Sequence, residues 1–153
     1  MKLVGKRGVS GALEIVTVLL MLTALGLMTG LWWLIPYVTG RVPGEAELYF
    51  EKYFAVLLFS GLLAECILWN ARGILHNVNT QKPFCRDNVR RLRLLGAECL
   101  ILGALYAVGV FFISRVFMVA VFVTFTVVGL TLLVFAELFH QAVQYKEENE
   151  STI

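Results

Sequence analysis

The chain has 153 residues, of which 59% are hydrophobic and only 16% are charged, and its formal net charge is +2 at pH 7. Soluble domains carry about 25% charged residues, so this composition excludes an ordinary soluble domain. The apolar stretches leave no room for a second folded domain, and we expect a single domain over residues 1–153.

Four apolar stretches follow one another along the chain. They lie at about residues 11–38, 53–74, 94–114 and 116–143. Each is long enough to cross a bilayer, which takes about 20 apolar residues. None alternates as a membrane β-strand does, so we predict an all-α protein, an integral membrane bundle of four transmembrane helices. We expect the first stretch to persist as a span, because Glu14 interrupts it early and no Ala-x-Ala-like cleavage site follows.

The charges between the stretches predict the orientation. The segment before the first span is basic, with Lys2, Lys6 and Arg7. The connection between the first two spans is acidic, with Glu45, Glu47 and Glu51 against Arg41. The cytoplasmic loop predicted at residues 75–93 is strongly basic. The positive-inside rule therefore places this loop and both termini in the cytoplasm, in a multi-pass protein of the bacterial cytoplasmic membrane. Arg115, in the tight outer turn, is an exception.

Pro83 interrupts the basic loop, and we expect a new helix to start at residues 85–87 and to run into the third span. No two of the three cysteines, Cys66, Cys85 and Cys99, have the Cys-x-x-Cys spacing. This argues against a membrane thiol oxidoreductase, whose exchange chemistry needs a dithiol. There is no nucleophile–base pair, phosphate loop or metal-binding spacing either. We therefore expect no enzyme activity and no cofactor.

Each predicted span contains one glutamate. These are Glu14, Glu65, Glu98 and Glu137. A carboxylate at membrane depth costs roughly 2.5–3.5 kcal/mol, so four of them suggest a shared polar site. Helix rise puts each roughly 7–13 Å from the cytoplasmic end of its span, although the spans alternate in direction. We predict that the four glutamates converge as a ligand- or cation-binding site, with at least three of their carboxylates facing the bundle interior on its cytoplasmic side.

Several interpretations of this acidic cluster remain open from the sequence. It can be a network of ion pairs that fixes the helix register, a pocket for a ligand or cation, a relay for protons or a substrate, or a metal site. An arginine stands seven positions to the cytoplasmic side of three of the glutamates, as Arg7, Arg72 and Arg91 do. Each can reach a carboxylate on a neighbouring helix. Glu137 has His140 nearby instead.

Gly26 and Gly30 in the first span form a small-residue packing motif. We expect them to pack inside the bundle. A seam between two copies of the chain is the alternative, so a homo-oligomer stays open.

Two motifs carry a family resemblance. The first is Lys82-Pro83-Phe84, followed by Arg86-Asp87-Asn88-Val89-Arg90-Arg91-Leu92-Arg93 and Gly96. The second is Val134-Phe135-Ala136-Glu137-Leu138-Phe139-His140-Gln141 with the tail Lys146-Glu147-Glu148-Asn149-Glu150-Ser151-Thr152-Ile153. Over essentially the whole chain, they resemble the YoaS-like bacterial family, small four-helix membrane proteins of unknown function. The family tends to have Ser or Thr where Cys85 stands, and an arginine near His140.

The resemblance implies a gene encoded beside a small Cro/CI-type helix-turn-helix regulator. We therefore expect a small regulatory or sensor protein whose cytoplasmic face engages that regulator. The candidate partner-binding residues are Arg86, Asp87, Asn88, Arg90, Arg91, Glu147 and Glu148. We expect no direct contact with nucleic acid, because the basic residues line a membrane interface instead of a soluble recognition helix. The alternative is a small transporter or an ion- or proton-coupled permease that uses the intramembrane glutamates.

Overall fold

The computed structural model describes residues 8–39, 46–113 and 116–151, and these ranges contain four helices. They are α1 (Val9–Thr39), α2 (Ala46–Asn79), α3 (Arg86–Ile113) and α4 (Val116–Ser151). Each is long and apolar enough to cross a membrane, so the prediction of an all-α protein with four candidate spans is confirmed. The start of the third helix at Arg86 also agrees with the prediction. Most of the predicted 75–93 loop is helical, however, and only residues 80–85 connect α2 to α3.

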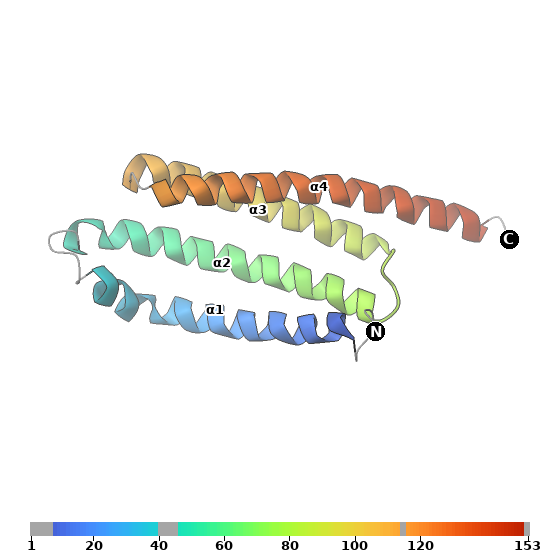
Figure 1. Cartoon of the computed structure of the whole chain (residues 1–153), viewed down its shortest axis with the longest axis horizontal. Helices are drawn as coiled ribbons and strands as arrows, with labels where there is room; N and C mark the ends of the chain where they lie inside the picture. The colour runs from blue at the N-terminus through green and yellow to red at the C-terminus, as the bar shows by residue number, and fades with distance from the viewer. Residues whose placement is uncertain (1–7, 40–45, 114–115, 152–153) are drawn as a thin grey trace.

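The four helices lie side by side in chain order, as an open row (Figure 1). α1 packs on α2, α2 on α3, and α3 on α4. Within the described ranges, no close backbone contact joins α1 to α3 or α4, or α2 to α4. The row therefore has no interior that all four helices share, which differs from the bundle that we expected.

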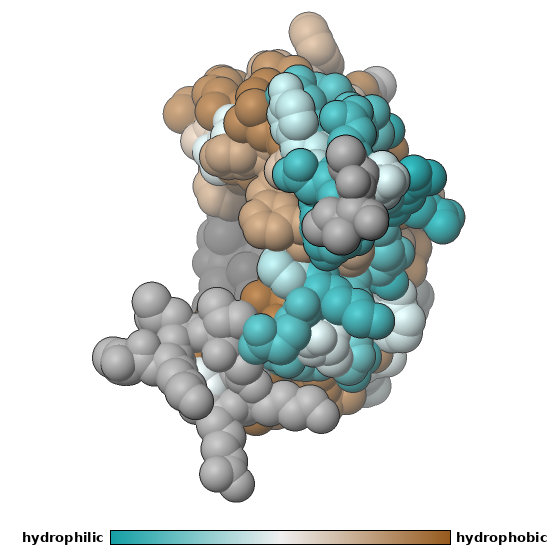
Figure 2. Space-filling view, turned by 90° about the vertical axis from the view of Figure 1, so that its right-hand side faces the viewer, coloured by the Kyte–Doolittle hydropathy of each residue, from teal (hydrophilic) through white to brown (hydrophobic). Residues whose placement is uncertain are grey.

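Because the helices alternate in direction, the starts of α1 and α3 lie at the same end of the molecule as the ends of α2 and α4 (Figure 1). We call this the basic end, since it carries Arg72, Arg86, Arg90, Arg91 and Arg93. Figure 2 looks onto it and shows hydrophilic residues gathered there, with hydrophobic residues along the flank. The last turns of α4 project beyond the other helices (Figure 1).

Glycines set the contact between α3 and α4. A methyl group added at Gly129 would lie 2.9 Å from the carbonyl oxygen of Gly96, and one at Gly96 would lie 3.0 Å from the carbonyl oxygen of Gly129. Farther along, a methyl group at Gly103 would lie 3.0 Å from Thr126 Oγ1. These small residues let the two backbones approach closely, as is usual where dispersion forces drive helix association in lipid.

The small-residue motif of α1, Gly26 and Gly30, faces away from the other helices. Nothing described lies within 4 Å of a methyl group added at Gly26 or Gly30, so the expectation that they pack inside the bundle is wrong. The contact between α1 and α2 uses Gly61 instead, whose added methyl group would lie 2.7 Å from Met28 Cγ. The physical reason is the row, which leaves one flank of α1 without a neighbouring helix in the described structure.

The end of α2 is closed by two hydrogen bonds in the pattern of a Schellman motif. The amide of Gln81 donates to the carbonyl of Val78 at 3.2 Å, and that of Lys82 donates to the carbonyl of Asn77 at 2.9 Å. Gln81 has a φ of 63°, the left-handed conformation that this motif requires and that glycine adopts most readily.

We expect Gln81→Gly to stabilise the protein by about 0.5–1 kcal/mol, because glycine removes the steric cost of the left-handed conformation at this position. Thermal unfolding in detergent, followed by circular dichroism, measures the change. Gln81→Ala serves as the control, since alanine keeps the Cβ atom and should give no such gain. Equal stability of the glycine and alanine variants would contradict the prediction.

Some sequence predictions concern parts of the chain outside the described residues. They are those on Lys2, Lys6, Arg7, Arg41, Glu45, Arg115, Thr152 and Ile153, and on the side chains of Glu47 and Glu51.

Candidate functional site

Glu14 joins the start of α1 to the end of α2. Its carboxylate accepts a hydrogen bond from Asn79 Nδ2 at 2.7 Å and lies 3.2 Å from His76 Nδ1. The Ser10 hydroxyl donates to Asn79 Oδ1 at 2.6 Å, and both Ser10 and Asn79 are buried. The result is a polar contact between two helices at the basic end.

Glu98 and Glu65 lie farther into the apolar region. Asn70 of α2, which is buried, donates from Nδ2 to Glu98 Oε1 across to α3 at 2.8 Å. The second carboxylate oxygen of Glu98, and Oε1 of Glu65, are buried and have no hydrogen bond within the described structure. Glu137 differs because its side chain is exposed, and Arg93 Nη2 donates to its Oε2 at 3.3 Å.

The structure does not bring the four glutamates together. Glu14 of α1 contacts one side of α2, and Glu98 of α3 contacts its other side. Glu137 of α4 contacts α3. In the described ranges, no group of three or more His, Cys, Asp or Glu side chains is placed to hold a metal ion. Because α1 and α4 lie at opposite edges of the row, a similar depth in the membrane does not make their carboxylates neighbours.

The arginines also pair differently from the expectation based on spacing. Arg91 Nε donates to Asp87 Oδ2 at 2.8 Å, on its own helix. Glu137 is paired with Arg93, although no arginine stands at the seven-residue spacing from it in the sequence. The antiparallel packing of α3 on α4 brings these two side chains together, and the spacing within one helix carries no signal of it.

Asn88 holds the α2–α3 connection together. It is completely buried, its Nδ2 donates to the Pro83 carbonyl at 2.7 Å, and its Oδ1 accepts from Asn77 Nδ2 at 2.8 Å. The ring of Phe84 packs on that of Phe139 in α4, with centroids 5.6 Å apart. Asn88 has no exposed surface to offer, so we remove it from the candidate partner-binding residues.

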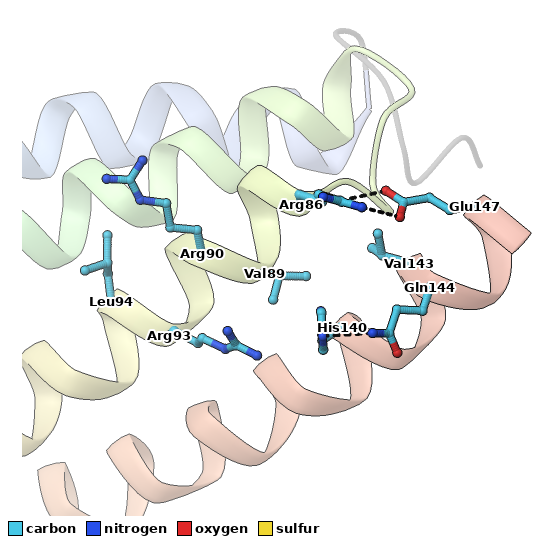
Figure 3. Close-up of a pocket in the computed structure, with 9 residues that line it drawn as sticks. All are labelled: Arg86, Val89, Arg90, Arg93, Leu94, His140, Val143, Gln144 and Glu147. Atoms are coloured by element: carbon cyan, nitrogen blue, oxygen red, sulfur yellow. Dashed lines mark hydrogen bonds and ion pairs between the residues drawn. The ribbon is translucent and has the colours of Figure 1, made fainter.

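Three of the remaining partner-binding candidates, Arg86, Arg90 and Glu147, line a groove between the start of α3 and the end of α4 (Figure 3). Asp87, Arg91 and Glu148 lie outside its lining. The groove has a volume of about 580 Å³ and is lined by Arg86, Val89, Arg90, Arg93, Leu94, His140, Val143, Gln144 and Glu147. Its buried valines, Val89 and Val143, come from one helix each. Three arginines against one glutamate give it a positive lining.

One ion pair bridges the groove at its open end. Arg86 donates from Nε and Nη2 to the two carboxylate oxygens of Glu147, at 2.8 and 2.7 Å (Figure 3). This bidentate geometry is the specific form of an arginine–carboxylate contact. Both side chains are exposed, so the pair orients the end of α4 more than it stabilises the fold. Arg90, which also lines the groove, makes no hydrogen bond or ion pair within the described structure, and its guanidinium points away from the Arg86–Glu147 pair (Figure 3). Arg86, Arg90 and Glu147 were predicted from the sequence as partner-binding residues, whereas the contributions of His140 and Gln144 to the groove were not.

Four long apolar helices, joined by polar contacts at one end, define a small multi-pass membrane protein. The model of the family described as protein of unknown function (DUF2975) matches residues 12–153. The chain belongs to this family, which agrees with the resemblance to an uncharacterised family of small membrane proteins. No curated protein and no solved structure matches the chain.

Proposed function

We propose that this protein is a membrane-embedded regulatory protein whose basic end lies in the cytoplasm and engages a small helix-turn-helix regulator. Support for the orientation comes from the alternation of the helices, which gathers Arg72, Arg86, Arg90, Arg91 and Arg93 at one end. An excess of arginine and lysine marks the cytoplasmic side of membrane proteins.

The strongest support for the proposal is the exposed, charged end of α4. Every residue from Gln144 to Ser151 is exposed, and this segment projects as a continuous helix past the other helices (Figure 1). Its charges are mainly acidic, with Glu147, Glu148 and Glu150 against Lys146, and it stands beside the positive groove. A surface with both signs of charge side by side favours a specific protein partner, because complementary charge selects the partner and its orientation.

The choice of a helix-turn-helix regulator as the partner rests on the family resemblance of the two motifs at the basic end. The structure supports a docking role for Arg86, Arg90, Glu147 and Glu148, which are all exposed. Asp87 and Arg91 are engaged with each other, so they contribute through the shape of the α3 start.

The transporter alternative has weaker support. It needs carboxylates that hand an ion or proton along a path, and Glu14, Glu98 and Glu137 each take a separate partner on a neighbouring helix. This geometry resembles contacts that position the helices.

Recruitment of the regulator to membranes tests the proposal. A Cro/CI-type helix-turn-helix regulator, of the kind that the family resemblance implies for the neighbouring gene, is expressed with the wild-type chain or a variant, and its membrane-bound fraction is measured. We expect Arg90→Glu to lower the affinity about tenfold or more, since a like charge now faces the partner's acidic contact. Arg90→Lys is the matched control and should retain binding, because Arg90 makes no internal contact that the change would break.

A second variant tests whether the partner reads the positions of the charges at the ion pair. The double exchange Arg86→Glu with Glu147→Arg keeps an internal pair while it inverts the surface charges, and we expect it to lose the regulator. A regulator that stays equally soluble and equally active with or without this membrane protein contradicts the proposed function.

A further inference from the structure

A second cavity lies between α2 and α3 at the basic end. It has a volume of about 270 Å³ and is lined by Trp69, Arg72, Gly73, His76, Asn77 and Arg91. It shares no lining residue with the α3–α4 groove. We propose that this cavity binds the phosphate-bearing headgroup of an anionic phospholipid, with Arg72 and Arg91 as its two cationic contacts.

Arg91 is held in place at the cavity by both helices. Its Nε donates to Asp87 Oδ2 at 2.8 Å, and its guanidinium lies directly against Gly73 of α2. A methyl group added at Gly73 would overlap that guanidinium. The glycine therefore makes the room that lets a cation from α3 face α2.

Arg72 supplies a second guanidinium that still needs an acceptor. Its Nε is buried and has no hydrogen bond within the described structure. A buried charged donor without an acceptor is costly, so an oxygen-rich anion in the cavity that Arg72 lines would stabilise the charge of its guanidinium. The Glu14 carboxylate interacts electrostatically with Arg72, but it already accepts a hydrogen bond from Asn79 and lies 3.2 Å from His76 Nδ1.

The lining favours a phosphate over other ligands. The lining contains two arginines and no acidic residue. The neighbouring carboxylate of Asp87 is outside the lining and accepts hydrogen bonds from Arg91 and Asn77. Guanidinium groups offer paired donors that match the oxygens of a phosphate. Basic pockets between membrane helices near the cytoplasmic face are where anionic headgroups bind.

The outer surface of α2 favours a lipid over a free phosphate. Phe59, Leu62, Cys66 and Trp69 recur at helical spacing on one face and are all exposed, with Phe59 at 57% and Trp69 at 58%. This face leads from the apolar region directly to the cavity, so an acyl chain can lie along it while the headgroup meets the arginines. Trp69 stands at the cavity itself, and tryptophan favours the headgroup level of a membrane.

Native mass spectrometry of the full chain, purified in detergent, tests the proposal. The protein is titrated with phosphatidylglycerol or with phosphatidylcholine, which has no net charge. We expect phosphatidylglycerol to bind about tenfold more tightly, and Arg72→Gln or Arg91→Gln to remove most of this preference. Arg90→Gln is the matched control on the same turn of α3, outside the lining, and should keep it.

Three outcomes would overturn the proposal. The first is equal binding of the two lipids by the wild type. The second is an equal loss of preference in Arg90→Gln, which indicates diffuse surface attraction. The third is inorganic phosphate that binds as tightly as phosphatidylglycerol in phosphatidylcholine nanodiscs, which indicates a soluble anion as the ligand. Helix content by circular dichroism in those nanodiscs separates lost binding from lost folding, and Arg72→Gln should leave it unchanged.

Discussion

Replacing Gly129 with leucine is expected to force α3 and α4 apart and to lower the free energy of unfolding by about 2–3 kcal/mol, the upper part of the usual range for overpacking. A side chain at this position would start 2.9 Å from the Gly96 carbonyl oxygen and 2.9 Å from Leu100 Cγ. The first of these contacts is with backbone, which cannot rotate away. Only movement of a whole helix relieves it, and that movement opens the closest interface of the row.

Gly26→Leu is the matched control for this variant. It places the same side chain in an apolar helix at a glycine with nothing described within 4 Å. Thermal unfolding in detergent, followed by circular dichroism, should show a clear loss of stability for Gly129→Leu and little change for Gly26→Leu. If both variants unfold at the same temperature, the glycine contact between α3 and α4 does not hold the row together.

The second large effect is expected for Asn88→Ala, which should lower the free energy of unfolding by about 2–4 kcal/mol. The change removes the hydrogen bond to the Pro83 carbonyl and the one from Asn77, at a side chain with no exposed surface. Each lost bond contributes about 1 kcal/mol, and a buried partner that is left unsatisfied costs about 1–3 kcal/mol more.

Thr80→Ala is the control in the same connection, because Thr80 is exposed and its hydroxyl bonds only to backbone carbonyls in the last turn of α2. Its effect should stay within about 0.5 kcal/mol, as is usual for surface positions. Hydrogen exchange at the start of α3 gives a second measurement, since loss of Asn88 should expose these amides. Similar stability and exchange for the two variants would show that Asn88 does not organise the turn.

The number of helices and their transmembrane character could be predicted from the sequence, because they depend on the length and hydropathy of each segment by itself. Apolar length predicted the spans because a bilayer core sets a minimum number of helical residues. Pro83 predicted the break, and the new helix begins at Arg86 as expected. The α2 end was harder to predict, because Gln81 takes the left-handed conformation that glycine usually marks, and the helix reaches Asn79 through the predicted loop.

The candidate site could be predicted only in part. Arg86, Arg90 and Glu147 were recognised as surface charges at one end, and they do border the groove. The pairing of Arg86 with Glu147 joins residues on two helices that meet only after α3 and α4 pack.

The sequence by itself determined that this is an all-helical chain with four candidate membrane spans and one strongly basic end, because length, hydropathy and charge act along each helix separately. Only the tertiary structure decided the neighbours. It placed the helices in a row, which separates Glu14 from Glu137, turns Gly26 and Gly30 outward and seats Arg91 against Gly73. Helical periodicity specifies the face on which a residue lies, but the close backbone approach of particular glycines selects which faces meet.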